Sequence, residues 1–185
     1  KVCAAFYGHP GIFACISHMA IADARKEGFD AHMEPGISAL DCLVADLGID
    51  PGSYGMQSME STQFMIYQRV IDPTALFILW QIGLAGDLTL KRFDTEPAHL
   101  QLVVEKLGRD YPLDHEVILY EAATHPLEQM RAEKIRLGDL PSAALKQITT
   151  LVIPPALAMQ KDQEMIDRLN ALAEERRRNS VSLFG

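Results

Sequence analysis

The chain has 185 residues, of which 48% are hydrophobic and 23% charged, and its formal net charge is -8 at pH 7. That length can bury the core of one or two domains, and the composition excludes intrinsic disorder. The negative balance argues against a general nucleic-acid binder, and no apolar run reaches the roughly 20 residues that a membrane-spanning helix needs.

The first third of the sequence predicts a strand, a helix and a second strand. Residues 1–7 (KVCAAFY) form the continuous small apolar run that is typical of a buried parallel strand. A Gly/Pro loop over 7–13, a helix over 14–27 that stops at Gly28 and a short strand over 29–33 follow. This order indicates a βαβ unit and therefore a parallel sheet. Because the first strand has no lead-in and no initiator Met, we expect the chain to be the later part of a longer one.

A second helix and a domain boundary are predicted next. Ser38 and Asp41 have the spacing of a capping box, which opens a helix that ends at Gly48. The Pro, Gly and Ser of residues 50–55 predict a loop between domains. We therefore expect the C-terminal part of a first α/β lobe over 1–50, a second α/β lobe over 51–158, and a C-terminal helix and tail over 159–185.

The remaining elements alternate between strands and helices. Residues 75–82 (ALFILWQI) predict a buried strand with one polar interruption, Gln81. A helix is expected at 97–107 and a shorter one at 140–145, with strands at 116–120, 134–137 and 149–153. The last element is an amphipathic helix over 160–178, whose apolar stripe consists of Met165, Ile166, Leu169 and Leu172.

Cysteine usage points to a reducing compartment. Cys3, Cys15 and Cys42 form neither a CxxC motif nor a spacing typical of a metal site. Their odd number and apolar surroundings predict buried, reduced thiols in a cytoplasmic protein that binds no metal.

Four loops beside the predicted strands are rich in small residues, at 7–13, 35–39, 121–124 and 149–150. Ligands of open α/β sheets bind outside the carboxyl ends of strands, where small residues let the backbone approach them. Tight packing and turn geometry would explain any one of these loops. Four of them in one chain favour a ligand cleft.

Three polar residues near these loops each have two interpretations. His9, held between Gly8 and Pro10, either contacts a ligand or braces the loop through a hydrogen bond. The amide of Gln81 finds its partner in a ligand or in neighbouring backbone. Tyr7 either packs in the core or places its hydroxyl at the edge of the cleft. The chain contains no GxSxG, HExxH, P-loop or GxGxxG motif.

The loops YGHPGIF at 7–13 and EPGISALD at 34–41 resemble the tetrapyrrole methylase family of class III S-adenosylmethionine-dependent methyltransferases. The likeness covers about residues 1–155 and includes ADLGIDP at 45–51, LWQIG at 79–83, YEAAT at 120–124 and ITTLVIPP at 148–155. It implies an α/β fold in two lobes, with the cofactor in the cleft between them and the N-terminal part of the first lobe absent from this chain.

The first loop of the family usually reads Gly-Asp-Pro. Here His9 stands in the place of that Asp, and the loop is similar to that of the borosin-type branch, which methylates backbone amide nitrogens of a ribosomal precursor peptide. Residues 180–185 show no apolar core-peptide repeat, so the chain resembles the split form, which acts on a separate peptide. The resemblance implies a homodimer, and the expected partners include no nucleic acid and no membrane. The alternatives are methylation of a tetrapyrrole (precorrin-like) or other small substrate, and a non-catalytic fragment or peptide-binding subunit.

The resemblance also implies which residues contact S-adenosyl-L-methionine, whose product is S-adenosyl-L-homocysteine. These residues are Tyr7, His9 and Ile12 in the first loop, Ser38 and Ala39 in the second, Gln81, Ala123, Thr149 and Thr150. The Arg and Tyr residues thought to act on the amide match positions before Lys1. The catalytic residues therefore stay unassigned, with Tyr7 as the candidate to assist them.

Overall fold

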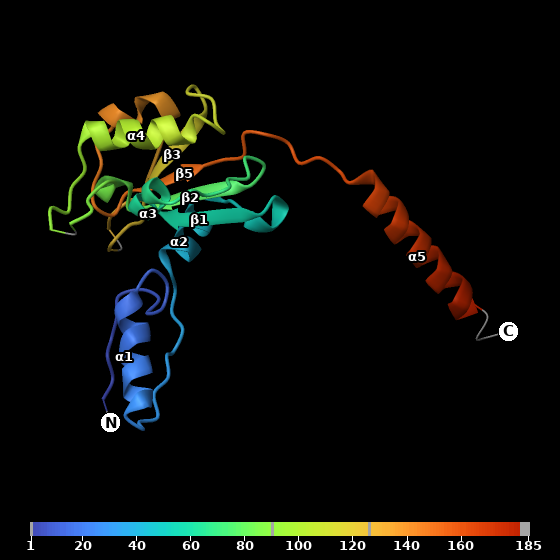
Figure 1. Ribbon diagram of the computed structural model, residues 1–185, viewed down its shortest axis with the longest axis horizontal. Helices are drawn as coiled ribbons and strands as arrows, with labels where there is room; N and C mark the ends of the chain where they lie inside the picture. The colour runs from blue at the N-terminus through green and yellow to red at the C-terminus, as the bar shows by residue number, and fades with distance from the viewer. Residues whose placement is uncertain (1, 90, 126, 182–185) are drawn as a thin grey trace.

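The computed structural model describes residues 2–89, 91–125 and 127–181. A five-stranded mixed sheet forms its centre, in the order β1-β2-β5-β3-β4 (Figure 1). β1 (Met56–Glu60) and β2 (Leu76–Trp80) are parallel, whereas β5 (Thr150–Ile153) runs antiparallel to β2 and to β3 (Glu116–Glu121), and β4 (Arg131–Arg136) runs antiparallel to β3. The sheet is therefore mixed: β1 and β2 are parallel, the other pairs of described strands are antiparallel, and the expectation of a parallel sheet is wrong for it.

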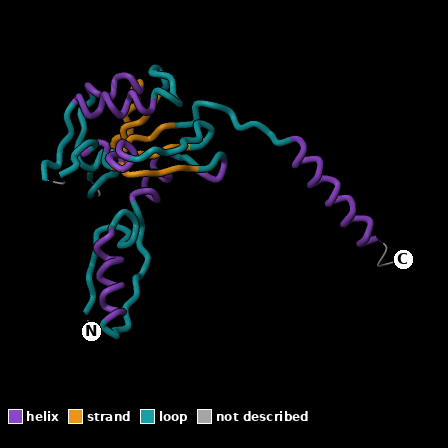
Figure 2. Tube along the Cα trace, in the orientation of Figure 1, coloured by secondary structure: helices purple, strands orange, loops and turns teal. Residues whose placement is uncertain are grey.

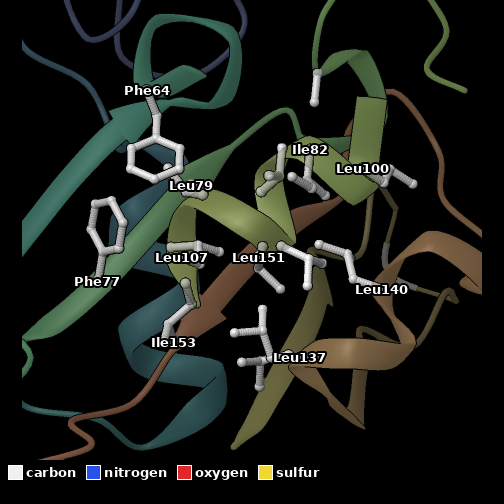
Figure 3. Packing of buried hydrophobic residues seen from close by; sticks show 14 of the residues in the cluster. Phe64, Phe77, Leu79, Ile82, Leu100, Leu107, Leu137, Leu140, Leu151 and Ile153 are labelled. Atoms are coloured by element: carbon white, nitrogen blue, oxygen red, sulfur yellow. The ribbon is translucent and has the colours of Figure 1, made fainter. Parts of the chain in front are cut away.

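Both faces of the sheet are covered by apolar contacts. Side chains of a strand alternate between the two faces, so Phe77 and Leu79 pack toward α4 (Pro97–Leu107), α3 (Ser61–Ile66) and the 3-10 helix η3 (Leu137–Ser142), as Figure 3 shows. Leu76, Ile78 and Trp80 pack on the opposite face with Leu43 of α2 (Ala39–Leu47). Burial on two sides explains why β2 is a continuous apolar run in the sequence.

The helix α2 begins and ends where its sequence predicts. The Ser38 backbone N–H donates to Asp41 Oδ2 over 2.6 Å as part of a capping box, and Gly48 closes the helix in the left-handed conformation, at φ 63°. Leu43 on this helix is fully buried against the sheet. The capping prediction is confirmed.

The two strands expected before residue 34 are wrong. Lys1 lies outside the described residues, and residues 2–7 and 29–33 have no strand geometry; they run on either side of α1 (Cys15–Lys26), as Figure 2 shows. A strand exists only by hydrogen bonding to a neighbour, and within the described residues no strand lies beside these segments. The predicted βαβ unit is therefore also wrong, although its helix is confirmed.

The prediction that the three cysteines are buried is also wrong. Cys3 and Cys15 are exposed and Cys42 is half-buried, with all three thiols free. Cys3 and Cys15 belong to the α1 segment, and no second layer of described residues covers it. Across the described ranges, no group of three or more His, Cys, Asp or Glu side chains is arranged to hold a metal ion.

Several boundaries differ from those expected. β4 begins before residue 134, the short helix is the 3-10 helix η3, and α5 (Gln163–Val181) starts later than residue 160. The stripe of α5 is largely exposed, at Met165, Leu169 and Leu172, because the helix projects away from the sheet (Figure 1). β1 and α3 were not expected at all. Among the described residues, no helix is both long and apolar enough to cross a membrane.

Candidate functional site

Three strands end at one edge of the sheet, where β5 begins. Glu60 pairs with Trp80, so the parallel strands β1 and β2 end side by side. Leu151 pairs with Leu79, and Thr150 pairs with Tyr120, so the start of β5 lies between the ends of β2 and β3. An edge that gathers strand ends in this way is the usual place for a ligand in an open α/β sheet.

A cavity of about 710 Å³ opens at this edge, between the first loop and α3. Its volume lies in the usual range for small-molecule and cofactor sites, about 300–1,000 Å³. The lining residues come from the start of the chain, from β1 and α3 and from the segment after β2: Gly11, Phe13, Ala14, Cys15, His18, Glu60, Thr62, Gln63, Ile66, Gln81, Leu84, Asp87, Leu88 and Phe93. Of the nine residues predicted to contact a ligand, Gln81 lines this cavity.

Gln81 has a backbone conformation that is uncommon for a residue with a side chain. Its φ is 56°, in the left-handed region, directly after the buried strand β2. Ser61 Oγ donates to its carbonyl oxygen over 2.9 Å, and the next residue, Ile82, donates its N–H to the carbonyl of Thr149 over 3.0 Å. At functional sites, hydrogen bonds from the surroundings keep such a strained conformation in place. Here this conformation places the exposed side-chain amide of Gln81 on the cavity wall.

The first loop is braced by His9. Its Nδ1 accepts a hydrogen bond from the Gly11 N–H over 3.0 Å, which is the structural one of the two roles considered for this residue. The loop touches the second loop so closely that a Cβ on Gly36 would lie 2.8 Å from the Gly8 carbonyl oxygen. Tyr7 is 91% exposed and Ile12 44% exposed, and neither lines the cavity.

In the second loop, Ser38 is buried and Ala39 exposed. The Ser38 hydroxyl donates to Asp41 Oδ2 over 2.7 Å, and the Ser38 side chain and backbone lower the pKa of Asp41, with a smaller contribution from His9. Ser38 therefore serves the helix cap, and the two loops are linked electrostatically as well as by contact.

The remaining predicted contacts lie at the sheet edge but outside the cavity. Thr149 and Thr150 are buried and Ala123 is exposed. Thr149 Oγ1 donates over 2.7 Å to Glu121, the last residue of β3. Since Thr149 also bonds the backbone beside Gln81, these two predicted residues are connected at the sheet edge.

Glu121 is the centre of a charged cluster that we did not predict. Arg131 Nη1 and Lys146 Nζ each donate to its carboxylate over 2.7 Å. Burial alone would raise its pKa, but the hydrogen bonds from Lys146, Thr149 and Arg131 lower it below the usual value. Its position after an apolar strand, followed by small residues, was the available signal.

The acidic residues of the cavity wall were also missed. Asp87 accepts from the Thr89 hydroxyl and from three backbone N–H groups between Thr89 and Phe93, and the Thr89 hydroxyl is the largest cause that lowers the pKa of Asp87 to about 2. Glu60 accepts from Thr62 and Gln63 at the start of α3. Glu is an uncommon N-cap, so the start of this helix has only a weak signal in the sequence.

The wall combines apolar surface with negative charge. Phe13 packs against Trp80, with ring centroids 5.8 Å apart, and Ile66, Leu84 and Leu88 add further apolar surface. Glu60 and Asp87 are acidic, and the described lining residues include neither Lys nor Arg. The cavity therefore suits a ligand with apolar and cationic parts better than a phosphate.

Comparison with known proteins gives concordant results. A family model, Tetrapyrrole (Corrin/Porphyrin) Methylases, matches residues 1–139. The chain is 39% identical over 176 residues to a methyltransferase/ribosomally synthesized cyclic peptide gymnopeptides precursor from Gymnopus fusipes, covering 92% of this chain and 41% of the relative. It is 40% identical over 168 residues to a methyltransferase/ribosomally synthesized type I borosin cyclic peptide precursor from Mycena rosella, covering 89% and 42%. The chain thus spans about two fifths of these relatives.

Solved structures share the fold. The methyltransferase CobJ is 16% identical, with a TM-score of 0.56 over 83% of this chain and 64% of its own. A uroporphyrin-III C-methyl transferase from Thermus thermophilus complexed with S-adenyl homocysteine is 15% identical, with a TM-score of 0.52 over 80% and 62%. The α/β fold is that of these methyltransferases.

Proposed function

This chain belongs to the tetrapyrrole (corrin/porphyrin) methylase family, and on that premise we propose that it carries the cofactor-binding part of a peptide methyltransferase. The cofactor is S-adenosyl-L-methionine, and the substrate is the backbone amide of a ribosomal precursor peptide. The observation that carries this proposal is the 39% identity, over 92% of the chain, to a relative whose name joins a methyltransferase to a cyclic peptide precursor.

The cavity beside Gln81 fits such a cofactor in volume and charge. When bound, the cofactor supplies a methyl group on a cationic sulfonium. Its amino group adds a second positive charge and its carboxylate one negative charge, so its net charge is positive. Glu60 and Asp87 on the wall are anionic, and Asp87, whose pKa is about 2, keeps its charge at neutral pH. Opposite charges attract across a partly desolvated wall more strongly than in water.

The other residues of the wall position the ligand and exclude water. Gln81 offers its amide as donor and acceptor, and the neighbouring segment 11–15 covers the cavity from the first loop. Ile66, Leu84 and Leu88 keep the wall apolar, which favours a displacement in which a positive charge is lost. The remaining proposed contacts around this centre are Tyr7, His9, Ile12, Ser38, Ala39, Ala123, Thr149 and Thr150.

An amide nitrogen is a weak nucleophile because its lone pair is delocalised into the carbonyl group. Alignment of nitrogen and methyl group can supply much of the rate, but a proton must also leave the nitrogen. In the described residues Tyr7 is the candidate to assist, since it is exposed at the start of the first loop. We propose that further Arg and Tyr residues for this step precede Lys1.

The substrate is proposed to be a ribosomal precursor peptide, which the names of the relatives join to the methyltransferase. We further propose a cytoplasmic homodimer. The alternative of a tetrapyrrole substrate has less support, from the name of the matching family and from solved structures at sequence identities of 13–20%.

Mass spectrometry tests this function. The protein, expressed with any residues that precede Lys1, is incubated with S-adenosylmethionine and a candidate peptide encoded beside its gene. We expect mass increments of one methyl group each, which fragmentation assigns to backbone nitrogens. Methylation of side chains alone, or of a tetrapyrrole in place of the peptide, would reject the proposal.

A further inference from the structure

The carboxylate of Glu121 is buried at the same edge of the sheet as the cavity, with 4% of the residue exposed. Arg131 Nη1 and Thr149 Oγ1 donate to Oε1, and Lys146 Nζ donates to Oε2, each over 2.7 Å. The three donors come from β4 and from the loop before β5. One carboxylate therefore joins β3, β4 and the loop before β5.

The hydrogen bonds of this cluster hold in place the backbone that flanks Gln81. Thr149 Oγ1 accepts the Lys146 N–H over 2.8 Å, and the Thr149 carbonyl accepts the Ile82 N–H over 3.0 Å. The contact is tight, because a Cβ on Gly83 would lie 2.1 Å from the Lys146 carbonyl oxygen. A shift of the Lys146–Thr149 loop would therefore move the left-handed turn at Gln81.

Stability alone does not explain a charge in this position. Removing a carboxylate from water costs several kcal/mol, and apolar replacements of buried ion pairs are often neutral or stabilising. Each oxygen of Glu121 is nevertheless matched by a cation, and the remaining bond goes to Thr149. Such a cluster fixes geometry, which a binding site needs and a hydrophobic core does not.

We propose that Glu121 is a positioning residue for the methyl donor: through Thr149 and the Lys146–Thr149 loop, it holds Gln81 in the conformation that binds the cofactor. This inference rests on the proposed function. Glu121 does not line the cavity, so it acts through Thr149 and Gln81 rather than by contact with the ligand.

The test compares Glu121→Gln with Glu133→Gln in the protein expressed with any residues that precede Lys1. Both glutamates pair with Arg131, but the side chain of Glu133 is 53% exposed. We expect Glu121→Gln to raise the KM for S-adenosylmethionine and the Kd for S-adenosylhomocysteine about tenfold, the scale of one lost charged hydrogen bond, with kcat changed less than about threefold. Glu133→Gln should change none of these values.

A second pair of variants tests the inference independently if Glu121→Gln fails to fold. The Lys146 side chain is 65% exposed, so Lys146→Met should fold, and it should raise the same KM severalfold, with rescue by Lys146→Arg. An unchanged KM and Kd in both Glu121→Gln and Lys146→Met, with only a lower melting temperature, would overturn the inference. Failure of the unsubstituted protein to bind S-adenosylhomocysteine would instead reject the proposed function.

Discussion

At the scale of single residues, Gln81 combines strain and exposure. A non-glycine residue at φ 56° persists only where the surroundings hold it, and here Ser61 holds its carbonyl group. Sequence reasoning identified Gln81 because a polar residue at the end of an apolar strand is conspicuous. Glu60 gave no such contrast, since it stands among polar neighbours, and Asp87 follows a Gly within a segment that has no strand or helix signal.

Substitution of Gln81 tests its role in binding. Gln81→Ala should raise the Kd for S-adenosylhomocysteine about tenfold in calorimetry, because the amide contributes one or two hydrogen bonds to the ligand. Gln101→Ala, an exposed glutamine on α4, is the matched control and should leave the Kd unchanged. Equal affinities for the two variants would remove Gln81 from the site.

The low pKa of Asp87 predicts that acid weakens the hydrogen bonds of the cavity wall. Its pKa falls from the usual 3.8 to about 2 on folding, so its bonds to residues 89–93 stabilise the fold above pH 4 and are lost as the pH falls toward 2. Asp87→Asn should therefore lower the urea midpoint at pH 7, and the difference from the unsubstituted protein should shrink between pH 4 and 2. A difference that grows with acidity would contradict this assignment.

At the scale of elements, the strands and helices with strong local signals were predictable. α4 and α2 have Pro97 and Ser38 at their starts, and β2 is apolar throughout. β1 was missed because the sequence MQSME is polar and half-buried, so no apolar run marks it. The strand expected at 1–7 did have an apolar run, and the one expected at 29–33 alternates apolar and polar residues, but pairing partners decide whether such a segment becomes a strand.

The helix α3, which forms one wall of the cavity, depends on a distant lysine. Lys106 Nζ donates to the carbonyl groups of Phe64, Met65 and Tyr67, at the end of this six-residue helix. Lys106→Met should lower the free energy of unfolding by about 2 kcal/mol, because charged hydrogen bonds to otherwise unpaired carbonyl groups are lost. The control Lys134→Met removes an exposed ion pair with Glu116 and should cost under about 1 kcal/mol. Equal effects of the two variants in urea titrations would exclude this role.

At the scale of the whole molecule, the sheet and its two apolar layers form a packed core, whereas α1 and α5 expose apolar side chains. Ile16 and Met19 are 69% and 60% exposed on α1, and Leu169 and Leu172 are 58% and 59% exposed on α5. No local pattern in the sequence distinguishes a helix that packs from one that does not. The division at residues 50 and 158 into two lobes and a tail remains a prediction.

The proposed homodimer is tested by light scattering. The protein, expressed with any residues that precede Lys1, should elute at twice its monomer mass at micromolar concentration, since exposed apolar side chains favour association. A monomer mass at every concentration would contradict the dimer and leave the proposed chemistry intact.

The cavity between the first loop and the ends of β1 and β2 is tested most directly by a crystal structure with S-adenosylhomocysteine. We predict that the ligand lies beside Gln81 and segment 11–15, with its α-ammonium group nearest Glu60 and Asp87. Electron density for the ligand on another face of the sheet, or a cavity filled by side chains, would contradict this placement.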